Sequence, residues 1–339
     1  MLPEPPYGII WNHLKRGEVV PFLGAGASLS GRPPSAEWDE KCATFPPIGR
    51  ELAHCLADDA AFPSHDPHDR EDLSKVASYY LEAADRPSLL FRLRAVFNHD
   101  YQAGEVHRFL ADLPIPLLIV TTNYDDLIEQ AFEEELRPFH LVVHPTDRKD
   151  LSASVLWWKP NVTEPIPCHP SKLPLSLTDT TIIYKMHGSV NRQTQKWDSF
   201  VITEEDYVEF LARMTGQSAI PARFMFHFRQ RRFLFLGYGL RDWNLRVMLK
   251  NLKTKLARSE VKAASSELHE PMSEEGLRSW AIQYQPSVLE RMLWQARRVN
   301  IYDMEINAFV AKMRELMDQE TRNLFSNTNQ LSGVAYDPG

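Results

Sequence analysis

Strand-length runs of mostly apolar residues recur along the chain and alternate with longer stretches of helical periodicity. The runs cover residues 19–23, 117–122, 181–186 and 233–236, with a shorter fifth run at 298–302. Strands that are apolar on both faces are typical of a parallel sheet covered by helices on both sides. The pattern therefore predicts an α/β fold, a Rossmann-like parallel sheet with helices on both faces.

The longest gap between two predicted strands is itself helical. Residues 48–60 and 71–97 carry apolar side chains at helical spacing, and Pro87 should break the second stretch. We expect a smaller helical subdomain over residues 32–105, inserted after the first strand of a main domain over 7–310. A C-terminal helix and flexible tail should fill 311–339. The proline-rich stretch 137–180 favours strands joined by loops.

Composition excludes several classes of protein. The 339 residues are 43% hydrophobic and carry a net charge of −7, so nothing favours direct contact with nucleic acid. No apolar run reaches the roughly 20 residues of a membrane helix, and the N-terminus does not resemble a signal peptide. Three scattered cysteines fit a reducing compartment. We therefore expect a cytoplasmic protein without membrane contact.

Small and polar residues follow each predicted strand. Because parallel strands end at one edge of a sheet, these residues should surround one ligand crevice. Glycines after the first strand let backbone N–H groups approach a phosphate, although the pattern is neither G-x-G-x-x-G nor a Walker A loop. The residues in question are Gly24-Ala25-Gly26-Ala27-Ser28, Asn123, Asp125, His187, Gly237-Tyr238-Gly239 and Asn300.

Each of these features has an ordinary structural explanation when taken alone. A histidine before a glycine at a strand end is commonly structural, and Asn123 and Asp125 could form a turn before the helix predicted at 127–136. We expect Asp126 to cap that helix. It is the order of the whole set along the chain that favours a functional site.

In this order the motifs resemble those of the sirtuin-like family of NAD-binding proteins. The turn Gly24–Ser28 is similar to that family's phosphate-binding turn, and Thr122-Asn123-Tyr124-Asp125 to its Asn/Asp motif. His187-Gly188 is similar to its catalytic His-Gly pair, and Gly237-Tyr238-Gly239 to its later glycine turn. Asn300 resembles the asparagine that contacts the adenosine ribose. The resemblance covers roughly residues 15–310.

The chain also departs from deacetylating sirtuins. Three cysteines without a Cys-x-x-Cys pair cannot build the four-thiolate zinc site of those enzymes, so no zinc is expected. Arg32-Pro33-Pro34-Ser35 does not match their sequence after the glycine turn. The departures resemble those of bacterial sirtuin-like NAD hydrolases, many of them anti-phage effectors. This resemblance implies cleavage of NAD, as substrate, to nicotinamide and ADP-ribose.

The same resemblance implies roles for the site residues. His187, Asn123 and Asp125 would be catalytic, and the two glycine turns with Asn300 would bind NAD. A protein deacylase or ADP-ribosyltransferase, and a module that senses NAD or ADP-ribose without turnover, remain alternatives. Because an uncontrolled NAD hydrolase would harm its host, we expect a homo-oligomer, a separately encoded activator, or both. A HerA-like ATPase or an Argonaute-like protein is the activator that the family implies.

Overall fold

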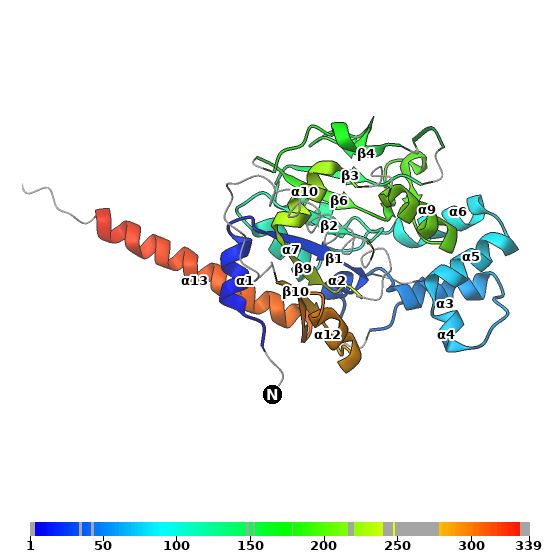
Figure 1. The fold of residues 1–339 in the computed structure, drawn as a ribbon, viewed down its shortest axis with the longest axis horizontal. Coiled ribbons are helices and arrows are strands. Elements are labelled where there is room, and N and C mark those ends of the chain that lie inside the picture. Colours follow the sequence, from blue (N-terminus) through cyan, green and yellow to red (C-terminus); the bar gives the residue numbers. More distant parts are fainter. Residues whose placement is uncertain are drawn as a thin grey trace, which may run out of the picture.

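The fold is taken from a computed structural model, which describes residues 4–33, 36–41, 44–146, 149–151, 153–177, 179–215, 220–239, 247 and 278–332. Its centre is a nine-stranded sheet in the order β11-β10-β9-β1-β2-β6-β3-β4-β5 (Figure 1). Neighbours from β11 to β3 run parallel, whereas β4 and β5 are antiparallel to their neighbours. The strands of this sheet are β1 (Val19–Leu23), β2 (Leu118–Thr121), β3 (Phe139–Val143), β4 (Val155–Trp158), β5 (Ile166–Cys168), β6 (Thr181–Lys185), β9 (Arg232–Leu236), β10 (Ser279–Gln283) and β11 (Val299–Asp303).

Helices cover both faces of this sheet, and a short hairpin of β7 (Gly188–Ser189) and β8 (Ser199–Phe200) stands beside it. The helices are α1 (Tyr7–Leu14), α2 (Ala25–Ser28), α3 (Gly49–Asp59), α4 (Pro67–Arg70), α5 (Leu73–Ala83), α6 (Arg86–Phe97), α7 (Glu105–Asp112), α8 (Leu127–Glu134), α9 (Glu204–Thr215), α10 (Ala222–Gln230), α12 (Val288–Gln295) and α13 (Ile306–Ser332).

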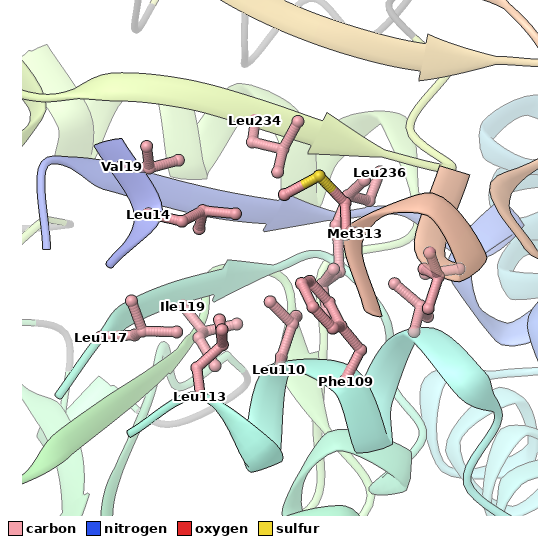
Figure 2. Packing of buried hydrophobic residues seen from close by; sticks show 14 of the residues in the cluster. Leu14, Val19, Phe109, Leu110, Leu113, Leu117, Ile119, Leu234, Leu236 and Met313 are labelled. Atoms are coloured by element: carbon pink, nitrogen blue, oxygen red, sulfur yellow. The ribbon is translucent and has the colours of Figure 1, made fainter. Parts of the chain in front are cut away.

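The predicted parallel sheet with helices on both faces is confirmed, because each central strand buries side chains on both sides. In β1, Val20 and Phe22 enter one apolar cluster with α10 and α12, while Val19 and Leu23 enter the other. The second cluster packs β1, β2 and β9 against α1, α7 and α13 (Figure 2). Phe109 of α7 and Met313 of α13 are fully buried there. Burying one such side chain contributes roughly 1.5–3 kcal/mol.

A third apolar cluster belongs to the helices inserted between β1 and β2. It joins α3, α5 and α6 to Tyr124 and Phe200 of the main body. The Tyr124 ring lies 5.4 Å from that of Phe97 and 5.2 Å from that of Phe200. The inserted helices therefore stand over the end of β2, on the right of Figure 1.

Several element boundaries match the sequence pattern and others differ. The break at Pro87 is confirmed, since α6 begins at Arg86 with the proline in its first turn. Strand β10 was not predicted. The C-terminal helix begins at Ile306, so the expected domain boundary at 310/311 falls inside α13, which projects from the body in Figure 1. Within the described residues, no helix is both long and apolar enough to cross a bilayer.

Candidate active site

Four parallel strands end level with one another at the edge that carries the predicted site. Leu23 of β1 pairs with Thr121 of β2 and with Leu236 of β9, and Thr121 pairs with Lys185 of β6. The residues that follow these strand ends include Gly24, Asn123, His187 and Gly237. The sheet thus brings all but one of the predicted motifs to one edge.

The two glycine turns pack directly against each other. The Gly26 N–H donates to the Gly237 carbonyl at 2.8 Å, and the Gly24 N–H donates to the Leu236 carbonyl at 3.1 Å. A Cβ on Gly26 would lie 2.7 Å from the Gly237 oxygen, and one on Gly24 only 2.6 Å from the Tyr238 Cα. The glycines are therefore required for backbone-to-backbone contact, and the Gly26 N–H already has a protein partner.

Three predicted polar residues form one buried hydrogen-bond network. The Asn123 Nδ2 donates to the Gly24 carbonyl and to the Ser28 Oγ, each at 3.0 Å. The Ser28 hydroxyl donates to the Asp125 Oδ2 at 2.9 Å. Asn123, Ser28 and Asp125 are 8%, 4% and 5% exposed. These bonds fix the three side chains relative to the first glycine turn.

Asp125 lies beside a buried ion pair. Burial raises the pKa of its carboxyl group, while the Lys185 charge and the Ser28 hydrogen bond act in the opposite direction. The Lys185 ammonium donates to the Asp125 carbonyl and to the Glu129 Oε1, the latter at 2.9 Å. Burial raises the pKa of Glu129 to about 7, against the lowering effect of Lys185. Neither Lys185 nor Glu129 was among the predicted residues.

His187 lies just after β6 and packs against aromatic side chains. Its side chain is 3% exposed, and its ring meets those of Tyr207 and Phe210 edge-on, at centroid distances of 5.4 and 5.7 Å. Both aromatic residues belong to α9. His144 lies nearby and was not among the predicted site residues. Burial, together with the charges of Arg213 and His187, holds the pKa of its imidazole well below the usual value.

Asn300 lies apart from the other predicted residues. It is the second residue of β11, the edge strand, where it pairs with Trp280. Trp280 pairs with Leu234, and Leu234 with Pro21, so Asn300 is level with the middle of β1 rather than with its end. The register does not bring Asn300 to the edge that holds Asn123 and His187.

The expected capping role of Asp126 is wrong. Its side chain makes no capping hydrogen bond to α8. Instead the Asp125 Oδ1 accepts the Leu127 N–H at 3.3 Å, and Asp126 pairs with the Arg192 Nε at 2.5 Å. The Asp126 carboxylate, next to the start of α8, is thus held by Arg192, a residue far away in the sequence.

The remaining predicted residues fill supporting positions. Tyr238 is buried against Phe22, with ring centroids 4.9 Å apart, and Ala25 opens the short helix α2. No atom of the described residues lies within 4 Å of the place where a Cβ on Gly239 would stand. The sequence also predicts that Asp242 caps a helix after the second glycine turn, and that residue lies outside the described residues. Among the residues that are described, no group of histidine, cysteine, aspartate and glutamate could hold a metal ion.

The fold and the order of the motifs along the chain indicate the class of protein to which the chain belongs. The family profile described as SIR2-like domain matches residues 117–302, more than half of the chain. The chain therefore belongs to the SIR2-like domain family.

Two similar proteins from bacteria are both named NAD(+) hydrolase. The protein NAD(+) hydrolase ThsA of Enterococcus faecium is 27% identical over 255 residues, which are 73% of this chain and 42% of that protein. NAD(+) hydrolase ThsA of Bacillus cereus (strain MSX-D12) is 24% identical over 319 residues, 93% of this chain and 56% of the relative. The chain thus spans about half the length of these two relatives.

Proposed function

We propose that this chain is an NAD hydrolase that cleaves NAD to nicotinamide and ADP-ribose. The observation that carries the proposal is the placement of Asn123, Asp125 and His187 at the ends of the adjacent strands β2 and β6. The names of the relatives, all NAD(+) hydrolases, support the same reaction.

In the proposed reaction, the bond between nicotinamide and the ribose C1′ breaks through an oxocarbenium-like state. Nicotinamide leaves with the bonding electron pair, and a water adds to C1′ and loses one proton. His187 accepts that proton as general base. Asn123 orients the ribose or the attacking water, and the Asp125 carboxylate stabilises the developing positive charge.

The two glycine turns complete the proposed NAD site. Gly24, Ala25, Gly26 and Ser28 would line the path of the pyrophosphate, and the turn Gly237-Tyr238-Gly239 the adenosine side. Since the Gly26 N–H is bonded to Gly237, other groups of the first turn would have to contact the phosphates. The position of Asn300 within β11 does not favour a ribose contact, so we leave it out of the proposal.

Release of nicotinamide from NAD by the purified chain tests the reaction. His187→Ala should lower the rate by about 100-fold to 10,000-fold, the usual contribution of a general base. His68→Ala is the matched control, because His68 is exposed on the short helix α4. In parallel, turnover is measured with an added acyl-lysine peptide, and the binding of NAD is measured separately. Peptide-dependent turnover would favour a deacylase, and NAD binding without any cleavage would favour a sensing module.

The biological role that we propose is depletion of cellular NAD in anti-phage defence, within the cytoplasm. Control would come from homo-oligomerisation, from a separate activator such as a HerA-like ATPase or an Argonaute-like protein, or from both. One surface suits self-association: α12 and the turn before it expose large apolar side chains. These are Tyr284, Val288, Leu289, Met292 and Leu293.

A further inference from the structure

A cavity of about 760 Å³ lies against α8, strands β3 and β4 and residues 189–193. Neither His187, Asn123 and Asp125 nor the glycine turns contribute to its lining. Its size falls in the range of roughly 300–1,000 Å³ that is typical of sites for small molecules. The cavity is therefore a separate site, next to the candidate active site and not part of it.

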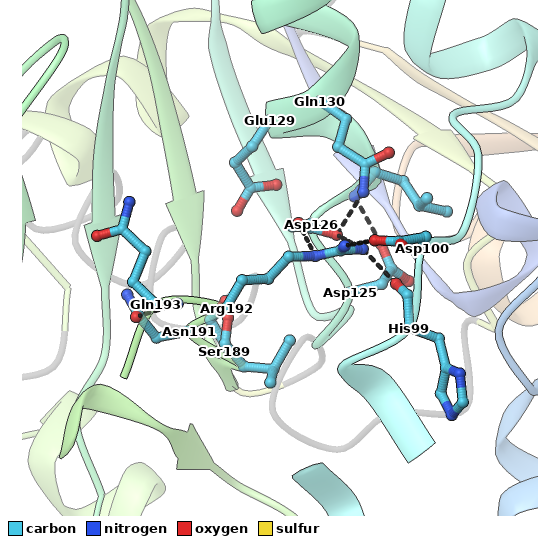
Figure 3. Close-up of polar contacts among 12 residues, drawn as sticks. His99, Asp100, Asp125, Asp126, Glu129, Gln130, Ser189, Asn191, Arg192 and Gln193 are labelled. Carbon is cyan, nitrogen blue, oxygen red and sulfur yellow. Dashed lines mark hydrogen bonds and ion pairs between the residues drawn. The ribbon is translucent and has the colours of Figure 1, made fainter. Parts of the chain in front are cut away.

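One wall of the cavity is acidic. Asp126, the residue just before α8, lines it together with Glu129 and Glu133 of that helix, and the spacing of three and four residues places the three carboxyl groups on one side. Figure 3 shows Asp126 and Glu129 close to the Arg192 side chain, which crosses from the segment after β7. Another part of the lining is aromatic and includes the buried rings of Trp158 and Trp197.

Two of the three basic residues that line the cavity are already bonded within the protein, and the third is exposed. Arg192 contacts Asp126, the His99 carbonyl and Asp100, the last at 2.7 Å. Arg137 donates to two backbone carbonyls just after α7 and at its end. Lys159 is exposed, with its ammonium 5.2 Å from the ring centre of Trp157.

Two of the three carboxyl groups have bonding capacity left, since only Asp126 is paired with Arg192. Glu129 is 6% exposed, its Oε1 accepts from Lys185, and its buried Oε2 has no hydrogen-bond partner among the described residues. Glu133 makes no ion pair within the described part of the chain. A buried acceptor without a donor is unfavourable, so an incoming N–H group would be stabilised there.

We propose that this cavity binds a small organic ammonium ion with an apolar or aromatic body. A rotation of the Glu129 side chain brings its free oxygen into the cavity, where it accepts from the ammonium, and the exposed carboxylate of Glu133 adds negative charge. The body packs among the apolar lining residues, where the face of an indole such as that of Trp158 attracts a cation. A neutral ligand of the same shape would fill the cavity but leave the carboxyl groups without this charge.

The protonation behaviour of the wall supports this ligand class. Burial raises the pKa of Glu129 to about 7, and also raises that of Glu133. Lys185 and Arg192 act against these shifts, whereas Asp126 reinforces both. Arg137 and Lys159 complete the set of charged groups around the cavity. An amine with a pKa near 10 stays charged while Glu129 loses its proton, so binding should strengthen between pH 6 and pH 8.

Calorimetric titration of the full chain tests the proposal with three related probes. Tryptamine is cationic, tryptophol is its neutral counterpart and indole-3-acetate is its anionic counterpart. We expect tryptamine to bind at least about tenfold more tightly than either of the others, and more tightly at pH 8 than at pH 6. Equal binding of tryptamine and tryptophol would overturn the proposal. So would the absence of binding by tryptamine, phenethylamine and agmatine at millimolar concentration.

Variants then locate the site. Glu133→Gln should weaken tryptamine binding about threefold to tenfold, whereas Glu135→Gln, an exposed position just beyond α8, should leave it unchanged. Leu141→Trp, which fills the cavity from β3, should abolish binding in a protein that still melts cooperatively. Equal effects of Glu133→Gln and Glu135→Gln would contradict the site. The readout is binding alone, so it is independent of whether the chain hydrolyses NAD.

Discussion

Lys185 lies between two buried polar regions, which differ in how many of their polar groups have hydrogen-bond partners within the protein. On the β2 side, the Asn123 amide, the Ser28 hydroxyl and the Asp125 carboxyl group bond to one another. On the α8 side, Glu129 keeps an oxygen without a partner among the described residues, next to a cavity. The first region is pre-organised by the protein itself, while the second keeps one acceptor without a partner, which is the oxygen that the proposed ligand would bond.

The largest expected effect comes from removing the lysine that joins these regions. Lys185→Met leaves Glu129 as a buried charge without a partner, which costs about 3–5 kcal/mol of unfolding free energy at pH 8. The cost should be smaller at pH 5, because Glu129 then takes up a proton. Urea unfolding at both pH values measures the difference. A cost that does not change with pH would contradict the described pairing.

A slightly smaller effect should show how tightly the first region is packed. In Gly237→Ala, the new methyl group would lie 2.2 Å from the Ala27 nitrogen, at a backbone φ of +61°. We expect a loss of about 3 kcal/mol in unfolding free energy. Gly239→Ala is the matched control, since no atom of the described residues lies within 4 Å of its Cβ position. Similar melting temperatures for the two variants would show that the turns do not pack as described.

The pH dependence of stability separates the two regions further. The pKa of Glu129 rises on folding from about 4.5 to about 7, so the folded state binds more protons between these values. Its contribution to stability is complete below pH 4.5 and is lost as the pH rises through 7. Wild type should therefore lose roughly 2–3 kcal/mol more than Glu129→Gln across this window. Parallel slopes in denaturant titrations at several pH values would refute the assignment.

The smallest effect concerns two neighbouring buried serines. Ser28→Ala removes the hydroxyl that bonds both Asp125 and Asn123, and should cost about 1–2 kcal/mol. Ser30→Ala should be close to neutral, because the Ser30 hydroxyl is buried without a partner among the described residues. Thermal melts of both variants give the comparison. A greater loss in Ser30→Ala would reverse it.

Local patterns predicted the parts of this molecule that local physics controls. The bounds of β1 follow from five consecutive buried residues, and the break before α6 follows from Pro87. Strand β10 was missed because its apolar core is only Trp280-Ala281-Ile282, between polar ends. Its pairing with β9 and β11 supplies what its sequence lacks.

Long-range partners decide what the pattern could not. Lys185 ends a buried strand, and its bonds to the Asp125 carbonyl and to Glu129, 56 residues earlier in the chain, explain a buried ammonium there. Asp126 stands where a helix cap is expected, yet Arg192 holds it. Asn300 matched a family motif, but the register of β11 places it away from the strand ends. None of these outcomes has a local signal in the sequence.

The most direct test of the central proposal is the rate of nicotinamide release from NAD by wild type, His187→Ala and His68→Ala, each shown to be folded by its melting curve. The account predicts cleavage by wild type and by His68→Ala, with the His187→Ala rate at least about 100-fold lower. Cleavage by His187→Ala at the wild-type rate would contradict the role of this edge of the sheet as the active site.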